Sequence, residues 1–334
     1  MRIVQSLWSK PAADFSGYAQ YHGRWPHARF FWLSWVISTG WAHKHYGDVE
    51  LVTDTEGARW LVDKLRLPFT SVRTDLNTLA APPKLWAAGK IVAYSVQREP
   101  FFHIDGDVYL TGKLPARFES AELVCQFVEE PITYPAFARI YDANRLAIER
   151  HVPKLPAFWP YMEERAAPNC GIVGGRNIEA FGRYARDVMS MLNDPANAQG
   201  WRRMQLHDAV NCVVEQQTLW CSAREQGIAI TPLFEPDDFR DDESFRRKAL
   251  QTHFNHAALE GKNPDFGQHL AERVEAEFPE QFRIISDLFP RKFMELGLPT
   301  AIEERSGDGA AASWEITSIE ALQIRPPPKK KPKN

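Results

Sequence analysis

The sequence predicts an α/β protein with a mostly parallel, Rossmann-type sheet flanked by helices. Two observations predict this class. The chain has 334 residues and is 44% hydrophobic, which is enough for one large buried core. Within the first hundred residues, short apolar runs of strand length alternate with longer helical segments, the order expected of a parallel sheet covered by helices.

The elements of this first part follow from local patterns. Aromatic residues at roughly helical spacing (Phe31, Trp35, Trp41) predict a helix over 28–46, and Asp54-Thr55 can cap a helix that begins at Glu56. The expected order is strand 3–8, helix 28–46, strand 49–53, helix 56–65, strand 69–73, helix 84–97 and strand 101–105. In such sheets ligands bind at the carboxyl ends of the strands.

After residue 107 the alternation of strands and helices is less regular. We expect strand 122–128, helix 135–150, a proline-rich loop 153–160, helices 180–192 and 209–225, strand 227–231, and amphipathic helix from 267. Residues 1–265 are therefore predicted to form the catalytic domain and 266–322 a C-terminal helical extension. Residues 323–334, rich in proline and lysine, are predicted to be a disordered tail.

Composition and charge limit the kinds of partner and location that we expect. The net charge of −3 and the pI near 6.4 provide no basic field for a nucleic-acid backbone, which favours a small-molecule substrate. The start of the chain lacks signal-peptide features, and the most apolar stretch, 30–42, is too short for a membrane span. Four cysteines without CxxC spacing fit a reducing cytoplasm, the predicted location. The basic tail is most simply solubilising, although it leaves peripheral membrane contact open.

The most informative motif is Asp105-Gly106-Asp107, which directly follows a buried apolar run. Two carboxylates at the carboxyl end of a strand offer hard oxygen ligands that suit Mn²⁺ or Mg²⁺, and such a cation can bridge two phosphates. Taken alone, Asp-x-Asp is more often an ordinary polar turn. An EF-hand is excluded because the further Asp-Gly of that loop is missing.

This motif resembles the DxD motif of GT-A nucleotide-sugar glycosyltransferases. Three later segments resemble landmarks of the glycogenin-like and bacterial galactosyltransferase branch in the right order: Asn169-Cys170-Gly171, Glu215-Gln216, and His253-Phe254 followed by Gly261-Lys262-Asn263-Pro264. The opening block 3–11 also resembles an uncharacterised bacterial family of glycosyltransferase-like proteins. Together the resemblance covers roughly residues 1–265.

The resemblance implies a GT-A-like fold and a role for each segment. Asp105, Asp107 and His253 would hold the metal. Asn169, Glu215 and Gln216 would act near the transferred sugar. The donor would also contact Lys90, Asp105, Gly171 and Lys262, with the two lysines at its phosphates. The implied reaction moves a hexose, with retention, from a UDP-sugar to a glycan or other hydroxyl acceptor.

This sequence departs from the branch at two places. Glu215 replaces an aspartate, and about five extra residues separate Phe254 from Gly261. His256 therefore competes with His253 as third ligand, although an exposed loop is expected around it. If the reaction inverted the anomeric centre instead, Glu215 would be the first candidate for the base.

Two other functions stay open at this stage. One is a metal-dependent phosphoesterase or nucleotide-sugar hydrolase that uses the same aspartates and histidines. The other is a catalytically silent nucleotide- or glycan-binding protein on the same scaffold. The sequence indicates neither the sugar, nor the acceptor, nor the oligomeric state.

Overall fold

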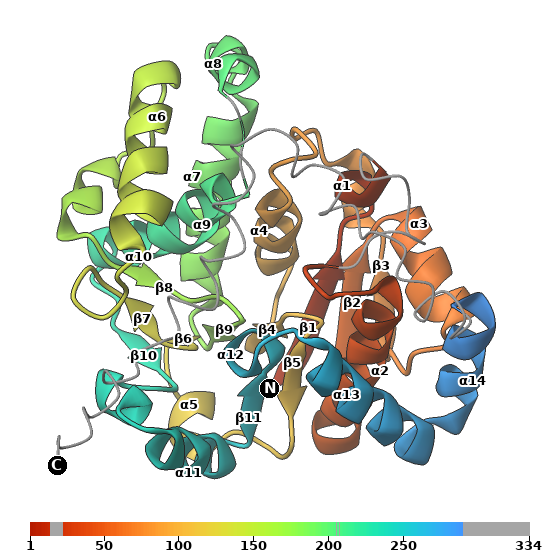
Figure 1. Ribbon diagram of the computed structural model, residues 1–334. Coiled ribbons are helices and arrows are strands. Elements are labelled where there is room, and N and C mark those ends of the chain that lie inside the picture. The colour runs from red at the N-terminus through yellow and green to blue at the C-terminus, as the bar shows by residue number, and fades with distance from the viewer. Residues whose placement is uncertain (14–22, 205, 207, 290–334) are drawn as a thin grey trace, which may run out of the picture.

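A seven-stranded sheet forms the centre of the computed structural model, which describes residues 1–13, 23–204, 206 and 208–289. The strand order is β10-β6-β9-β4-β1-β2-β3 (Figure 1). Neighbouring strands run parallel except at β9, which is antiparallel to both β4 and β6. The predicted α/β class with a mostly parallel sheet flanked by helices is therefore confirmed.

The strands of this sheet are short and mostly buried. They are β1 (Arg2–Leu7), β2 (Val49–Thr53), β3 (Ser71–Arg73), β4 (Phe101–Ile104), β6 (Leu123–Cys125), β9 (Ile172–Gly175) and β10 (Ile230–Pro232). Two small antiparallel ladders complete the strands: β5 (Val108–Leu110) with β11 (Phe254–His256), and β7 (Val128–Glu129) with β8 (Ala167–Pro168).

The α-helices are α1 (Lys10–Ala13), α2 (Ala28–Tyr46), α3 (Thr55–Ala58), α4 (Ala87–Ser95), α5 (Ala116–Glu119), α6 (Ala143–His151), α7 (Ile178–Asn193), α8 (Ala198–Arg203), α9 (Val210–Cys212), α10 (Thr218–Glu225), α11 (Asp242–Thr252), α12 (Ala257–Glu260), α13 (Pro264–Glu277) and α14 (Pro279–Leu288). Shorter 3₁₀ turns are Asp75–Thr78, Trp159–Glu164 and Pro236–Phe239. Three π-helical segments are Arg59–Lys64, Ala138–Asp142 and Val213–Gln217.

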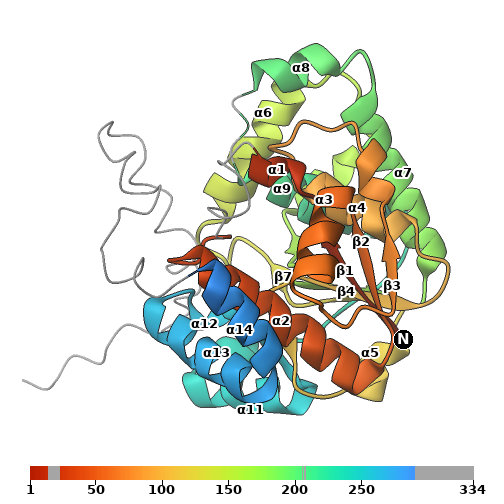
Figure 2. The same ribbon diagram turned by 90° about the vertical axis from the view of Figure 1, so that its right-hand side faces the viewer.

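Helices cover both faces of the sheet. Figure 2 shows α2, α13 and α14 on one side of the central strands and α4 and α7 on the other. Successive residues of β2 serve the two sides, because Leu51 lies in the core beneath α2 while Val52 lies in the core beneath α4. Side chains alternate across a strand, so every residue of a strand that is covered on both faces is buried. This explains why all five residues of β2 are buried.

Most predicted elements are present, several with different bounds. Helix α2 has the predicted bounds, and Asp54 caps α3 by accepting a hydrogen bond from the backbone N–H of Gly57. The predicted helix 56–65 is α3 followed by a π-helical segment, and the predicted helix 209–225 is interrupted by another. The predicted strand 122–128 divides into β6 and β7, because Gln126 and Phe127 leave the sheet to pair with the backbone of Asn169.

The C-terminal helices are part of the molecule's packing. Leu270, Ala271 and Val274 of α13 and Ile285 of α14 share one hydrophobic core with α2. The predicted division at 265 remains a prediction, and the predicted tail 323–334 lies outside the described residues. Within the described chain, no helix combines the length and apolar character that crossing a membrane requires.

Candidate active site

The Asp105-Gly106-Asp107 turn links β4 to β5 at the carboxyl end of β4. The backbone N–H of Asp105 donates to the carbonyl of Gly171 over 3.0 Å, and the N–H of Ala257 donates to the carbonyl of Asp107 over 2.9 Å. Segments from two distant parts of the chain are therefore fixed to this turn. Because β4 is a central strand, this turn lies where ligands bind in parallel sheets.

Two serines of helix α2 hold the same turn by hydrogen bonds to its backbone carbonyls. The hydroxyl of Ser38 donates to the carbonyl of Asp105 over 3.2 Å, and that of Ser34 donates to the carbonyl of Gly106 over 2.9 Å. The indole of Trp35 packs directly on Gly106, where a Cβ atom would lie within 2.7 Å of three ring atoms. Glycine at this position is therefore a requirement of the close approach between turn and helix.

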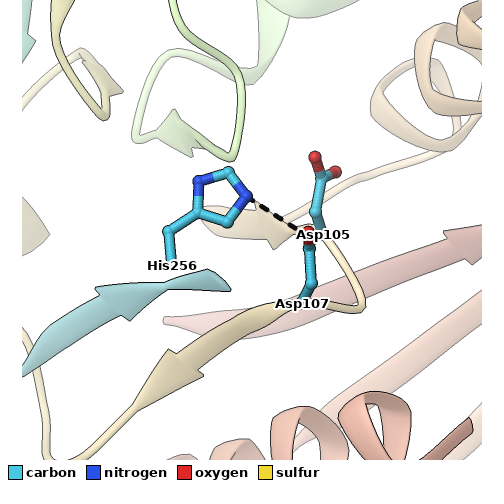
Figure 3. A group of neighbouring side chains, drawn as sticks. All are labelled: Asp105, Asp107 and His256. Atoms are coloured by element: carbon cyan, nitrogen blue, oxygen red, sulfur yellow. Dashed lines mark ion pairs between the residues drawn. The ribbon is translucent and has the colours of Figure 1, made fainter. Parts of the chain in front are cut away.

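His256 projects toward this turn from β11. Strand β11 pairs with β5 in a register that places His256 opposite Val108, the residue after Asp107. The imidazole Nε2 lies 3.4 Å from Asp107 Oδ1, and the dashed line in Figure 3 marks this pair. One ligand atom from each of Asp105, Asp107 and His256 can be chosen so that all three lie within 4.8 Å of one another.

These three side chains fit a divalent cation. Ligand atoms about 2.1 Å from a cation in octahedral geometry lie about 3 Å from each other, close to the separation seen between His256 and Asp107. Two carboxylates and one imidazole form a donor set suited to Mn²⁺, and the carboxylates alone would also accept Mg²⁺. Lysine ammonium groups lie beside both carboxylates, Lys90 at Oδ1 of Asp105 and Lys262 at Oδ2 of Asp107.

Lys90 of α4 lies between two acidic side chains. Its ammonium is 2.9 Å from Asp105 Oδ1 and 2.8 Å from Glu215 Oε1, and it donates to the carbonyl of Cys170 over 3.0 Å. Burial by itself would lower the pKa of Lys90, but the two neighbouring carboxylates outweigh burial and raise it. Lys90 is therefore a permanent cation that fixes the orientation of Asp105.

Lys262 performs a similar role for Asp107 but from a more open position. Its ammonium lies 2.7 Å from Asp107 Oδ2 and donates to the carbonyl of Gly23 over 2.9 Å. Burial would raise the pKa of Asp107, yet Lys262 and His256 hold that pKa well below its usual range. Asp107 is thus ionised at neutral pH, as a metal ligand must be.

A second polar cluster joins Asn169 to Gln216. The amide of Asn169 donates to Glu129 Oε1 over 2.9 Å, while the hydroxyl of Tyr141 lies between Glu129 Oε2 and Gln216 Oε1. A phenol has one proton, so a protonated Glu129 can supply the second hydrogen bond. Burial does raise the pKa of Glu129, against the opposing effect of the bonds from Asn169 and Tyr141.

The sequence profile of a family of unknown function (DUF6734) matches residues 1–288. The chain belongs to this family. The match runs from β1 through α14, so both the aspartate turn and the C-terminal helices fall within it. No protein of curated function matches this DUF6734 protein in sequence.

Solved structures with a related arrangement are remote. The galactosyltransferase LgtC, crystallised with donor and acceptor sugar analogs, is 9% identical over 85% of this chain and 100% of its own, with a TM-score of 0.40. Mouse xyloside xylosyltransferase 1 in its apo form is 12% identical over 69% of this chain and 84% of its own, with a TM-score of 0.34. Neither likeness is near enough to assign an activity to this DUF6734 protein.

The structure brings most of the sequence-predicted residues together. Direct contacts connect Asp105, Lys90, Glu215 and Gly171, and a further contact connects Asp107 to Lys262. Asn169 belongs to the same short segment as Gly171, and Gln216 follows Glu215 in the π-helical segment. Single π-helical turns are common at functional sites because they redirect consecutive side chains, here Glu215 into the core and Gln216 toward Tyr141.

His253 is the exception, and the structure places His256 beside the aspartates in its stead. His253 ends α11 in the left-handed conformation with φ of 54°, and its ring packs beside Gly112. Phe254 and Asn255 separate it from His256, so the two Cα atoms are at most about 10 Å apart. The expectation of an exposed loop around His256 is wrong, because this residue belongs to β11 and its side chain is 9% exposed.

Sequence reasoning missed the residues that support the site. Ser34, Ser38, Gln126, Glu129 and Tyr141 lie on elements whose positions relative to the aspartates depend on the fold. The one available signal was a polar residue, Gln126, at the end of a buried apolar run.

Proposed function

We propose that this protein transfers a sugar from a nucleotide-sugar donor to a hydroxyl acceptor, with a divalent cation held by Asp105, Asp107 and His256. One observation carries the proposal. Segments around residues 90, 105–107, 169–171, 215–216 and 256–262, distant in sequence, converge at the carboxyl end of β4. These include the segments that resemble GT-A landmarks, so their convergence supports that resemblance.

The proposed donor is a UDP-hexose, and the proposed cation is Mn²⁺ or Mg²⁺. When bound, the cation would neutralise charge on the diphosphate that leaves with the nucleotide. Lys262 would exchange its contact with Asp107 for a phosphate oxygen, because its side chain, 18% exposed, is the more accessible of the two lysines. Lys90 would hold Asp105 in place, since its contacts are Asp105, Glu215 and the carbonyl of Cys170.

Asn169 and Gln216 would bind hydroxyl groups of the transferred sugar. Both side chains are partly exposed. Gln216 accepts a hydrogen bond from Tyr141, while Asn169 donates to Glu129 and accepts from the backbone N–H of Gly171. An anchored amide keeps its remaining donor or acceptor aimed in one direction, which lowers the cost of orienting the sugar.

The surroundings of Glu215 support retention of anomeric configuration. An inverting reaction needs a carboxylate base that can reach the acceptor hydroxyl. Glu215 is 1% exposed and its Oε1 is engaged by Lys90 and Tyr94, so it is unsuited to that task. In the front-face alternative the leaving phosphate accepts the acceptor's proton, and the enzyme supplies no base.

The test is donor turnover with Mn²⁺ and with a chelator, using UDP-, GDP- and CMP-sugars and a panel of hydroxyl acceptors. We expect Mn²⁺-dependent binding of UDP and slow donor consumption, both largely lost in Asp107→Asn. The exposed Asp237→Asn is a matched control that removes a carboxylate away from the site. Equal UDP affinity with Mn²⁺ and with chelator would refute the proposal.

The same experiment separates the remaining alternatives. Metal-dependent UDP binding without consumption of any sugar nucleotide would indicate a silent binding protein. Hydrolysis of simple phosphoesters at rates above those for sugar nucleotides would indicate a phosphoesterase. Two-metal phosphoesterases need further acidic or imidazole ligands, and in the described residues Asp105, Asp107 and His256 form the one group of three that could hold an ion.

A further inference from the structure

Gln126 is a buried glutamine immediately behind the candidate metal site. Its side chain is 0% exposed and it follows β6, where the chain leaves the sheet. Its backbone N–H donates to the carbonyl of Asn169 over 3.0 Å, and its carbonyl accepts from the N–H of Phe234 over 2.9 Å. The backbone is therefore fixed on both sides, and the side chain has a defined origin.

The amide of Gln126 makes one hydrogen bond and leaves the other half unpaired. Its Oε1 lies 2.8 Å from Nδ1 of His256, while its buried Nε2 has no partner among the described residues. A buried donor without a partner costs about 1–3 kcal/mol. An apolar side chain at this position would avoid that cost. What it could not replace is the hydrogen bond between Oε1 and the imidazole.

That bond determines which ring nitrogen of His256 carries the proton. An amide oxygen only accepts hydrogen bonds, so Nδ1 of His256 must be the protonated nitrogen. In the neutral ring the lone pair is then on Nε2, the nitrogen that faces Asp107 Oδ1. This is the form of the ring that binds a cation through Nε2.

We propose that Gln126 is a positioning residue that holds His256 in the tautomer protonated at Nδ1 and so presents Nε2 to a divalent cation. The inference rests on the cation of the proposed function. Hydrogen bonds to metal-binding histidines commonly change metal affinity 10- to 100-fold when removed. Gln126 would act by the same physical means.

Gly171 provides the space for this arrangement. A Cβ atom there would lie 2.8 Å from both Nδ1 and Cε1 of His256 and closer still to Oε1 of Gln126. The carbonyl of the same glycine accepts the N–H of Asp105. Gly171 therefore joins the aspartate side of the site to the Gln126–His256 pair without contributing a side chain.

The proposal has a consequence for cation selectivity. Imidazole nitrogen is a good ligand for Mn²⁺, whereas Mg²⁺ prefers oxygen ligands and retains water. Loss of the correct tautomer should therefore weaken Mn²⁺ binding much more than Mg²⁺ binding. A general loss of fold would weaken both equally, so the ratio of the two affinities separates the two effects.

The experiment measures Mn²⁺ affinity by paramagnetic resonance of the free ion and Mg²⁺ affinity by competition, without donor or acceptor. The variants are Gln126→Leu, Gln126→Glu, His256→Ala and the double variant of Gln126→Leu with His256→Ala. Gln97→Leu serves as the matched control, because it removes a buried amide that bonds to Glu50 at the other end of the sheet. Thermal unfolding in chelator reports stability separately.

We expect Gln126→Leu to weaken Mn²⁺ binding 10- to 100-fold and Mg²⁺ binding less than threefold. Gln126→Glu, which keeps an acceptor oxygen, should retain Mn²⁺ affinity. In the His256→Ala background, Gln126→Leu should cause no further loss. Equal weakening of Mn²⁺ and Mg²⁺ binding would overturn the proposal. So would an undiminished loss of Mn²⁺ affinity on Gln126→Leu in the His256→Ala background.

Ring ¹⁵N spectra of the metal-free protein provide a readout that does not require metal. At a pH where His256 is neutral, its signals, assigned by their loss in His256→Ala, should show the proton on Nδ1, and Gln126→Leu should shift population toward Nε2–H. A ring protonated at Nε2 in the unmodified protein would refute the inference on its own. Absence of any Mn²⁺ binding would instead refute the metal in the proposed function, and with it the role given to Gln126.

Discussion

Replacing Gly106 by alanine tests whether the close contact between the aspartate turn and α2 is what sets the carboxylates in place. The added Cβ would lie 2.7 Å from Cδ2 and Cζ2 of Trp35, and nearer still to Cε2. Trp35 is 3% exposed and packs within the core beneath α2, so its ring has little room to move. Overpacking of this kind typically costs about 1–3 kcal/mol of unfolding free energy.

Because the ring of Trp35 has little room to move, the turn must shift to relieve this contact. If it moves outward, the hydrogen bonds from Ser34 and Ser38 to its carbonyls lengthen, and both carboxylates leave their positions beside His256. We therefore expect Gly106→Ala to weaken Mn²⁺ binding at least about tenfold, equivalent to about 1.4 kcal/mol, in addition to lowering stability.

The decisive comparison uses a second background. Trp35→Leu removes the atoms Cε2 and Cζ2 that the new methyl group would meet. Chemical denaturation of both single variants and the double variant measures the coupling between the two sites. Gly106→Ala should cost less than about 1 kcal/mol when residue 35 is leucine. An equal cost in the two backgrounds, or unchanged Mn²⁺ affinity in Gly106→Ala, would refute the reasoning.

Three further outcomes follow from the described contacts. His256→Ala should weaken Mn²⁺ binding at least about tenfold while His253→Ala leaves it unchanged, since a ligand contributes at least as much affinity as the hydrogen bonds that orient it. Titration calorimetry measures both affinities, and loss in His253→Ala alone would support His253 as the ligand. Lys90→Met should cost about 3–5 kcal/mol of unfolding free energy because Glu215, 1% exposed, would lose its cation. Adding Glu215→Gln should recover part of that free energy, as measured by urea denaturation, and no recovery would contradict the pairing of Lys90 with Glu215. Because burial raises the folded-state pKa of Glu129 above its ordinary value near 4.5, the native state binds the proton more tightly and stability falls as pH rises from the unfolded-state pKa through the folded-state pKa. Glu129→Gln should therefore gain stability relative to the unmodified protein over that pH interval, and a pH-independent difference would refute the raised pKa.

How much of the site could be predicted depends on whether the evidence was local. Asp105 and Asp107 stand at the end of an apolar run, so both their chemistry and their place at a strand end are evident in consecutive residues. The resemblance implied that Lys90, on the helix before the aspartate strand, contacts the donor's phosphates. Its actual neighbours, Asp105 and Glu215, became apparent only when α4 and the π-helical segment were packed together.

The sequence by itself determined the α/β class, the alternation of strands and helices in the first hundred residues and the aspartate turn. These features depend on periodicity and on the capping and turn preferences of neighbouring residues. The tertiary structure decided which histidine meets the aspartates. Two histidines three positions apart have nearly the same local context, and the choice depends on the register of β11 against β5, which places His256 beside Asp107 and His253 at the end of α11. It also decided the partner of Gln126, since a hydrogen bond between residues 130 positions apart is set by the packing of β6 and β11 around Gly171, which neither local sequence specifies.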